Sequence, residues 1–372
     1  MGMSMKLMCS KFMVAITLVL LQITILPMQV AAIDELVRQV REQTAKSNTT
    51  CILVFGDSSV DPGNNNYIPT DNKGNFPPYG KNFDNGTSTG RFSNGKLATD
   101  FIAEALGYRN IVRGFLEPQL EMKDMLHGVS FASAGSGYDD LTANLTSVLT
   151  ITKQVEYLMH YKIHLGQHIG KVKAEETLRN AIYILSFGTN DFIQNYFEEI
   201  DRAKQFTVAQ YQNFLISRLA LAITKMHRIG ARRVAVVGVP PLGCFPLVEM
   251  IRDDDNKCDG PLDSVAIAFN SLIKQKLADL SKSLSIRTAY IDIYGSIMSA
   301  VQKPNQYGFK ETAKGCCGTG TVEFGDSCKG MSTCADPTKY IYWDAVHPTE
   351  TMYKIVADDA LKAIIVGNFL AN

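Results

Sequence analysis

An excess of charge of either sign is absent from this sequence: lysine and arginine together number 37, and aspartate and glutamate also number 37. The basic residues form no long run that could follow a phosphate backbone, so we expect no nucleic-acid partner. No second apolar run of membrane-spanning length follows the N-terminal one, so we expect no transmembrane span in the mature chain. Pro/Ser-rich linkers, repeats and low-complexity tracts are missing too, which favours a single domain over residues 33–372.

Two patterns typical of other enzymes are also missing. No Gly-x-Ser-x-Gly elbow occurs, and Gly135-Ser136-Gly137 is not followed by a third glycine at dinucleotide spacing. The α/β-hydrolase fold and dinucleotide binding therefore lose support. His160, His164 and His168 recur every four residues, but Gly166 is expected to break the helix before the third, which favours surface histidines over a metal site.

The first 32 residues have the layout of a secretory signal peptide. Lys6 and Lys11 precede an apolar run from Phe12 to Leu26, and a stretch of small residues after Pro27 ends at Ala32. The run is near the lower limit of roughly 20 residues for a spanning helix, so an uncleaved anchor is the alternative. A signal places the mature chain in the secretory route.

Cysteine usage agrees with export, because seven cysteines remain after the signal is removed. Cys51 lies in an apolar run and is expected to be a buried, unpaired strand residue. The others stand in loop-like sequence and are disulfide candidates: Cys244, Cys258, Cys316, Cys317, Cys328 and Cys334. The neighbours Cys316 and Cys317 can hardly bridge each other, so each should pair with Cys328 or Cys334, and either pairing is possible. Cys244 should then pair with Cys258.

Three triplets match the acceptor pattern for N-glycosylation, which matters only for a chain that enters the secretory route. They begin at Asn48, Asn85 and Asn144. We expect two of the three to carry sugar.

Apolar runs rich in β-branched residues alternate with stretches of helical period. The expected strands are Cys51–Phe55, Gly128–Phe131, Ile182–Phe187, Arg233–Val239 and Thr288–Ile293. The expected helices are Gly95–Leu106, Thr152–Leu165, Val208–Ile229, Leu262–Leu284 and Thr349–Val366. This alternation predicts a flavodoxin-like three-layer α/β/α sandwich with a five-stranded parallel sheet, and a long ordered loop over 61–95 that shapes a site.

Polar residues follow three of the expected strands, at the sheet edge where ligands bind in open α/β folds. Ser58 follows the first, a glycine-rich turn around Gly135 the second, and Asn190 the third. A hydroxyl, exposed backbone N–H groups and an amide side chain are the parts needed to hold a tetrahedral oxyanion. The missing base is expected in Asp344-Ala-Val-His347, where Asp344 could orient His347 toward Ser58.

Four blocks with distinctive motifs follow one another along the chain: Phe55–Asn64, Gly128–Gly137, Gly188–Asp191 and Asp344–Pro348. In these blocks and their order, the chain resembles the GDSL (SGNH) esterase/lipase family, specifically its plant-type branch. Further plant-type segments are Gly90–Gly95, Pro240–Cys244 and Cys316–Gly320. The chain departs from the family pattern at Ser59, where Leu would stand, and at Ser130 and Ala134, where Asn and Gly are common.

The resemblance implies an SGNH-hydrolase fold and ester hydrolysis through an acyl-enzyme, without metal or organic cofactor. Ser58 would be the nucleophile, with Asp344 and His347 completing the triad. The N–H groups of Ser58 and Gly135 and the side chain of Asn190 would form the oxyanion hole. Asp191 is read as structural.

The same resemblance implies a plant protein secreted to the cell wall or apoplast, with the vacuole as the alternative. The substrate is expected to be a lipid ester, a wall acetyl ester or a small ester, and family membership does not choose among them. Two alternative functions are an acyltransferase that uses the same site and a catalytically silent wall- or lipid-binding protein.

Overall fold

The computed structural model describes residues 35–252, 258, 260–366 and 369–370. The expected signal peptide, residues 1–32, lies outside the described residues. Among the helices that are described, none combines the length and the apolar character needed to cross a bilayer.

A six-stranded parallel sheet occupies the centre, in the order β2-β3-β1-β4-β5-β6. The strands are β1 (Ile52–Gly56), β2 (Arg113–Gly114), β3 (Gly128–Ser130), β4 (Ile182–Ser186), β5 (Arg233–Val237) and β6 (Arg287–Ile291). Every residue of β1, β4 and β5 is buried, which is why these strands read as nearly continuous apolar runs. Without β2, the order is the 2-1-3-4-5 of flavodoxin-like folds, as predicted.

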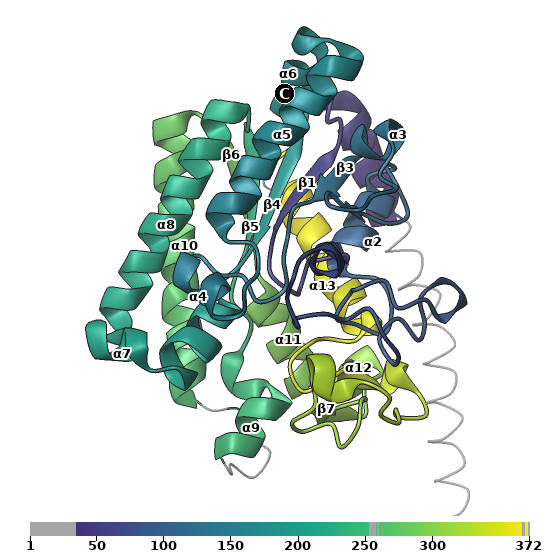
Figure 1. Cartoon of the computed structure of the whole chain (residues 1–372), viewed down its shortest axis with the longest axis vertical. Helices are drawn as coiled ribbons and strands as arrows, with labels where there is room; N and C mark the ends of the chain where they lie inside the picture. Colours follow the sequence, from purple (N-terminus) through teal and green to yellow (C-terminus); the bar gives the residue numbers. More distant parts are fainter. Residues whose placement is uncertain (1–34, 253–257, 259, 367–368, 371–372) are drawn as a thin grey trace, which may run out of the picture.

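Helices cover both faces of this sheet and complete the expected three layers (Figure 1). On one face lie α5 (Ile151–Ile169), α8 (Val208–Ile229) and α10 (Gly260–Leu284). On the other lie α2 (Ala98–Ala105), α11 (Ile293–Gln302) and α13 (Glu350–Val366). Both α10 and α13 pack against β6.

Shorter helices complete the structure. They are a helix over 35–46, α3 (Met122–Met125), α4 (Asp140–Leu145), α6 (Lys171–Asn180), a π-helical segment η3 (Asp191–Glu198), α7 (Asp201–Gln205), α9 (Pro246–Arg252) and α12 (Pro304–Tyr307). Short 3-10 turns are η1 (Asn64–Tyr67), η2 (Asp84–Gly86), η4 (Leu242–Cys244), η5 (Gly325–Cys328) and η6 (Pro337–Lys339). The expected long loop over 61–95 therefore contains no strand and no helix other than the 3-10 turns η1 and η2.

The prediction of a five-stranded sheet is wrong by one strand. The five expected strands are present within two residues of their predicted bounds, but β2 was missed. It consists only of Arg113 and Gly114, which pair with Val129 and Ser130 at the edge of the sheet. Two residues show no periodicity, so only the tertiary pairing makes them a strand.

The sequence located α8 to the residue, whereas α5 is longer than predicted. Thr207 and Gln210 form a capping box at the start of α8, and Gly230 ends it. In α5 the expected break at Gly166 is wrong, because the helix continues to Ile169 and ends at Gly170, which has a φ of 85°. A helical glycine costs about 1 kcal/mol, which the buried face of α5 offsets.

A disulfide-linked segment follows α12. Strands β7 (Glu311–Gly315) and β8 (Tyr340–Tyr342) pair in parallel, and the chain between them carries two disulfides, Cys316–Cys334 and Cys317–Cys328. This choice between the two possible pairings was not readable from the sequence. The third disulfide, Cys244–Cys258, has the predicted partners. Cys51 is free and buried as expected, and burial raises the pKa of its thiol to about 11.

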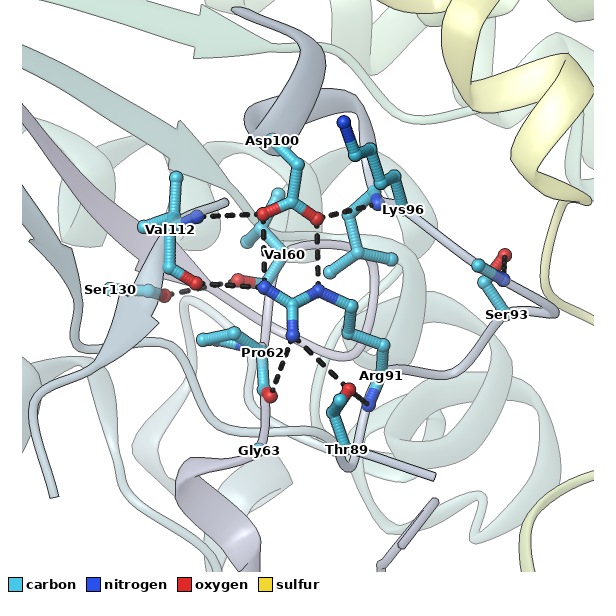
Figure 2. A network of polar contacts seen from close by, with 12 residues as sticks. Val60, Pro62, Gly63, Thr89, Arg91, Ser93, Lys96, Asp100, Val112 and Ser130 are labelled. Atoms are coloured by element: carbon cyan, nitrogen blue, oxygen red, sulfur yellow. Dashed lines mark hydrogen bonds and ion pairs between the residues drawn. The ribbon is translucent and has the colours of Figure 1, made fainter. Parts of the chain in front are cut away.

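A buried ion pair fastens the long loop to the edge of the sheet (Figure 2). The Arg91 guanidinium donates to both carboxylate oxygens of Asp100, each at 2.9 Å, and both side chains are almost fully buried. Arg91 also donates to the carbonyl oxygens of Pro62 and Val112, while Asp100 accepts the N–H of Val112. One ion pair therefore joins the chain after β1, α2 and the entry to β2.

We predict that Asp100→Ala lowers the free energy of unfolding by about 3–5 kcal/mol, because it leaves the Arg91 guanidinium buried without its counter-ion. Urea unfolding followed by circular dichroism measures the change. The matched control is Glu104→Ala, which breaks the more exposed Lys96–Glu104 pair and should cost less than about 1 kcal/mol. Equal losses in both variants would contradict the structural role given to the buried pair.

Candidate active site

The turn after β1 presents Ser58 at the carboxyl edge of the sheet. Gly56 is required there, because a Cβ atom on it would lie 2.5 Å from the carbonyl oxygen of Ser186 in β4. The next residue, Asp57, donates its N–H to that same carbonyl oxygen and is itself buried. The close approach of Gly56 to β4 and the hydrogen bond of Asp57 therefore fix the turn, and Ser58 remains partly exposed.

Ser58, His347 and Asp344 form a hydrogen-bonded chain. The Nε2 atom of His347 lies 2.8 Å from the Oγ of Ser58, and its Nδ1 lies 2.7 and 2.9 Å from the two carboxylate oxygens of Asp344. An ionised carboxylate only accepts hydrogen bonds, so Nδ1 carries the hydrogen in this arrangement and Nε2 is left to accept from Ser58. The structure thus brings together the three residues that the sequence singled out.

Asp344 is fully buried and its carboxylate is held from several directions. Its Oδ1 accepts the backbone N–H groups of Val346 and His347 at 2.8 and 2.7 Å. Its Oδ2 accepts the hydroxyl of Tyr79 at 2.6 Å. The Phe92 ring lies against His347, with the ring centroids 4.9 Å apart. Carboxylate and imidazole are therefore fixed before any substrate arrives.

The glycine-rich turn after β3 lies beside the turn that carries Ser58. Ser133 donates its N–H to the Gly56 carbonyl, and Ala134 donates its N–H to Oδ2 of Asp61. Gly135 has a φ of 90°, and a Cβ atom on it would lie 2.4 Å from Nδ2 of Asn72. This position therefore requires glycine both for its backbone conformation and for space.

The third element of the predicted oxyanion hole is Asn190, which follows β4. Its Nδ2 donates to the carbonyl oxygen of Ser136 at 2.9 Å, and its side chain is half-buried. An amide nitrogen carries two hydrogens, so the second remains for another acceptor. In the part of the chain that the structure describes, the N–H groups of Ser58 and Gly135 also have no protein acceptor.

Asp191, expected to be structural, fastens the glycine-rich turn to η3. Its carboxylate accepts the N–H groups of Tyr138 and Asp139 and the hydroxyl of Thr142, at 2.7, 3.1 and 2.6 Å. A Cβ atom on Gly137 would lie 2.2 Å from Oδ1 of Asp191. The carboxylate therefore takes the space that glycine leaves.

Sequence reasoning missed Gln154, a buried residue of α5. Its Oε1 accepts the N–H of Gly56, and its Nε2 donates to the Gly56 carbonyl and to Oγ of Ser136. One amide thus connects the turn that carries Ser58 to the glycine-rich turn. No sequence pattern indicated it, because a polar residue on the apolar face of an amphipathic helix only interrupts the helical hydrophobic pattern.

The structure accounts for two of the three departures from the family pattern. The hydroxyl of Ser59 donates to Asp57 at 2.7 Å and lies 2.8 Å from the hydroxyl of Ser186. The hydroxyl of Ser130 donates to the Val60 carbonyl and accepts the N–H of Ala132. Both hydroxyls therefore have partners under the site; nothing in the structure explains Ala134.

The remaining predicted sites are dispersed. His160, His164 and His168 all lie on α5 and are exposed, so the predicted break was wrong although the expected exposure is found. Asn48, Asn85 and Asn144 are exposed as well. Accessible acceptor asparagines are compatible with glycosylation.

Comparison with known proteins identifies the family. A model of the GDSL-like lipase/acylhydrolase family matches residues 52–360. The chain belongs to the GDSL-like lipase/acylhydrolase family. This GDSL hydrolase is 49% identical to the Arabidopsis thaliana protein GDSL esterase/lipase At5g45950 over 95% of this chain and 98% of that protein. It is 40% identical to GDSL esterase/lipase At2g42990 of the same plant, over 86% and 92% of the two chains. Its class of enzyme is therefore carboxylic ester hydrolase.

Two solved structures align with this GDSL hydrolase at low sequence identity. One is Axe2, an acetylxylan esterase from Geobacillus stearothermophilus, with 12% identity, a TM-score of 0.40 and coverage of 85% of this chain and 94% of that one. The other is LAE5, an α/β hydrolase enzyme from the metagenome of Lake Arreo, with 10% identity, a TM-score of 0.39 and coverage of 84% and 94%.

Three buried carboxyl groups around the site have raised pKa values. Burial raises the pKa of Asp57 and of Asp61 to about 6 and that of Asp191 to about 7, although each accepts hydrogen bonds. Desolvation penalises the charged form and outweighs those bonds. The folded protein therefore holds these protons at a pH where the unfolded chain, with a pKa near 4, has released them.

We predict that Asp191→Asn costs more stability at pH 5 than at pH 8. Because the folded pKa of Asp191 is raised, its stabilising term is present below the unfolded pKa and is lost as pH rises toward 7. A neutral amide lacks this term, so the two unfolding penalties should differ by about 2 kcal/mol between the two pH values. Urea unfolding at both values, with the exposed Asp201→Asn as control, measures it; the same penalty for Asp191→Asn at both would contradict the shift.

Proposed function

We propose that this GDSL hydrolase cleaves carboxylic esters through a Ser58–His347–Asp344 triad and an acyl-enzyme. The observation that carries the proposal is the 2.8 Å contact between Nε2 of His347 and Oγ of Ser58, with Nδ1 of the same ring on a buried carboxylate. A serine hydroxyl is a weak nucleophile until an oriented imidazole takes its proton. The ring geometry supports that transfer, and the family supports the ester as substrate.

In the proposed mechanism, Ser58 attacks the ester carbonyl carbon while His347 accepts the hydroxyl proton. The carbonyl oxygen becomes an oxyanion that accepts hydrogen bonds from the N–H groups of Ser58 and Gly135 and from Asn190. His347 then returns the proton to the leaving alkoxide, and the alcohol departs. Water attacks the acyl-serine by the same route, with His347 as base, and releases the carboxylic acid and Ser58.

The assignment of donors to the proposed oxyanion hole is supported by the fixed positions of these groups. Asp61 anchors the turn before Gly135, and the Ser136 carbonyl holds one hydrogen of the Asn190 amide. Donors that need not reorient at the moment of reaction stabilise developing charge better than water does. Such preorganisation is what the proposed acyl transfer requires.

We also propose that the mature chain begins after a signal peptide of residues 1–32, forms one domain over 33–372 and is secreted, with the cell wall or apoplast as destination. Three disulfides, three glycosylation triplets with exposed asparagines and the N-terminal apolar run all fit an oxidising, exported environment. N-terminal sequencing of the secreted product tests the cleavage.

We predict that Ser58→Ala lowers kcat on p-nitrophenyl esters by about 10⁴-fold or more, because the variant has no nucleophile for the acyl-enzyme. Esters from short to long acyl chains, assayed with the secreted mature chain, would also give the chain-length preference. The control Ser217→Ala, on the exposed side of α8, should keep full activity. Full activity in Ser58→Ala would refute the mechanism, and a folded wild type inert on every ester would direct the assay to acyl transfer.

We predict that Asn190→Ala lowers kcat by about 10²–10³-fold with little change in KM, since an oxyanion donor acts on the transition state more than on the bound ester. The assay is the same ester series. The exposed Asn213→Ala serves as the control for loss of an asparagine amide. A rise in KM at unchanged kcat would instead assign Asn190 to ground-state binding.

A further inference from the structure

Tyr79 stands in the long loop, far in sequence from the triad, yet is completely buried beside it. It belongs to a small apolar cluster that is separate from the main core. This cluster also includes Phe92, Trp343 and three of the disulfide cysteines. The Phe92 ring that contacts Tyr79 edge-on also lies against His347. Tyr79 therefore occupies the space behind the proposed base.

The hydroxyl of Tyr79 has two partners. It donates to Oδ2 of Asp344 at 2.6 Å and accepts the backbone N–H of Gly325 at 2.7 Å. Gly325 lies inside the loop closed by the Cys317–Cys328 disulfide. The carboxylate that orients His347 is thus connected, through one phenol, to the disulfide-linked segment.

We infer that Tyr79 is a positioning residue for the Ser58–His347–Asp344 triad, which sets the orientation of Asp344 and the basicity of the carboxylate toward His347. The inference rests on the proposed function, because it assigns a role within that triad. Two backbone N–H groups fix Oδ1 of Asp344, whereas Oδ2 depends on Tyr79 and on Nδ1 of His347. Without the phenol, Oδ2 would keep only the imidazole.

The phenol stays a donor over the working pH range. Burial, together with the negative charge of Asp344, raises the pKa of Tyr79 well above its ordinary value. The positive end of its O–H dipole points at the carboxylate and offsets part of the negative potential that reaches the imidazole. Loss of the hydroxyl therefore stabilises the protonated, inactive form of the base.

Other titratable groups near this region include Asp57, whose charge acts on His347, and Tyr353, whose pKa is raised by burial and by the charges of Asp57 and Asp344. Neither is altered by a change at Tyr79. Their contribution to the pH profile is therefore common to the wild type and to the variants.

The test compares Tyr79→Phe with Tyr161→Phe, a matched control. Tyr161 is also fully buried, and its hydroxyl donates to the Met125 carbonyl over the same 2.6 Å, but on α5 away from the triad. We expect Tyr79→Phe to lower kcat about tenfold at unchanged KM and to move the acid limb of the kcat/KM profile to higher pH by about half a unit. Tyr161→Phe should lose thermal stability only.

A spectroscopic measurement separates positioning from packing. The Nδ1 proton shared by His347 and Asp344 should give a low-field proton NMR signal, which we expect to move in Tyr79→Phe and to stay in Tyr161→Phe. Should Tyr79→Phe fail to fold, Tyr79→3-fluorotyrosine keeps the ring and the hydroxyl while making it a stronger donor. This substitution should move the acid limb in the opposite direction, to lower pH.

The outcomes distinguish the two proposals. If wild type and Tyr161→Phe hydrolyse esters in a Ser58-dependent way and Tyr79→Phe has the same kcat, pH profile and low-field signal, Tyr79 only packs and the inference is overturned while the esterase mechanism stands. An unmoved acid limb in folded Tyr79→3-fluorotyrosine would overturn it too. If Ser58→Ala retains the wild-type activity, the triad itself fails and the inference fails with it.

Discussion

A carboxylate buried without any solvent exposure, that of Asp344, constrains the C-terminal part of the molecule. A buried charge is tolerable only when hydrogen bonds satisfy it, and four donors do so here: two backbone N–H groups, the Tyr79 hydroxyl and the His347 ring. The two N–H donors come from the next few residues, so the loop from Asp344 to Pro348 must curl around its own side chain. That curl places His347 in reach of Ser58.

At the other turns of the site, too, a buried carboxylate accepts backbone N–H groups. These carboxylates have no role in the proposed reaction. Asp61 accepts the N–H groups of Gly63, Asn64 and Ala134, and Asp191 accepts those of Tyr138 and Asp139. Each side chain satisfies N–H groups of turns that have no strand or helix partner to do so. The raised pKa values of these groups record the desolvation cost of making the turns rigid. Rigid turns are what a preorganised oxyanion hole needs.

How much could be predicted follows from how local each signal is. The buried strands and α8 carry their information in consecutive residues, and the Asp-x-x-His spacing puts the proposed base and its proposed orienting acid in one loop. β2 could not be predicted, since two residues become a strand only beside β3. The roles of Tyr79 and Gln154 could not be predicted either, because their hydrogen-bond partners lie 265 and 98 residues away in the sequence. Neither residue belongs to a sequence motif that indicates a site.

The disulfide-linked segment connects the site to the proposed export. Cys316 and Cys317 donate their N–H groups to the Trp343 carbonyl, and Ala345 donates its N–H to the Glu323 carbonyl, so the segment holds the chain on both sides of Asp344. Gly325 in the same segment positions the hydroxyl of Tyr79. The segment has only short strands and 3-10 turns, with a small apolar cluster that contains three of its cysteines. Such a loop-rich piece gains its rigidity from cross-links more than from burial, because disulfides reduce the entropy of the open chain. On the proposed export, an oxidising compartment lets these cross-links form, and they then help to hold the proposed base in its orientation.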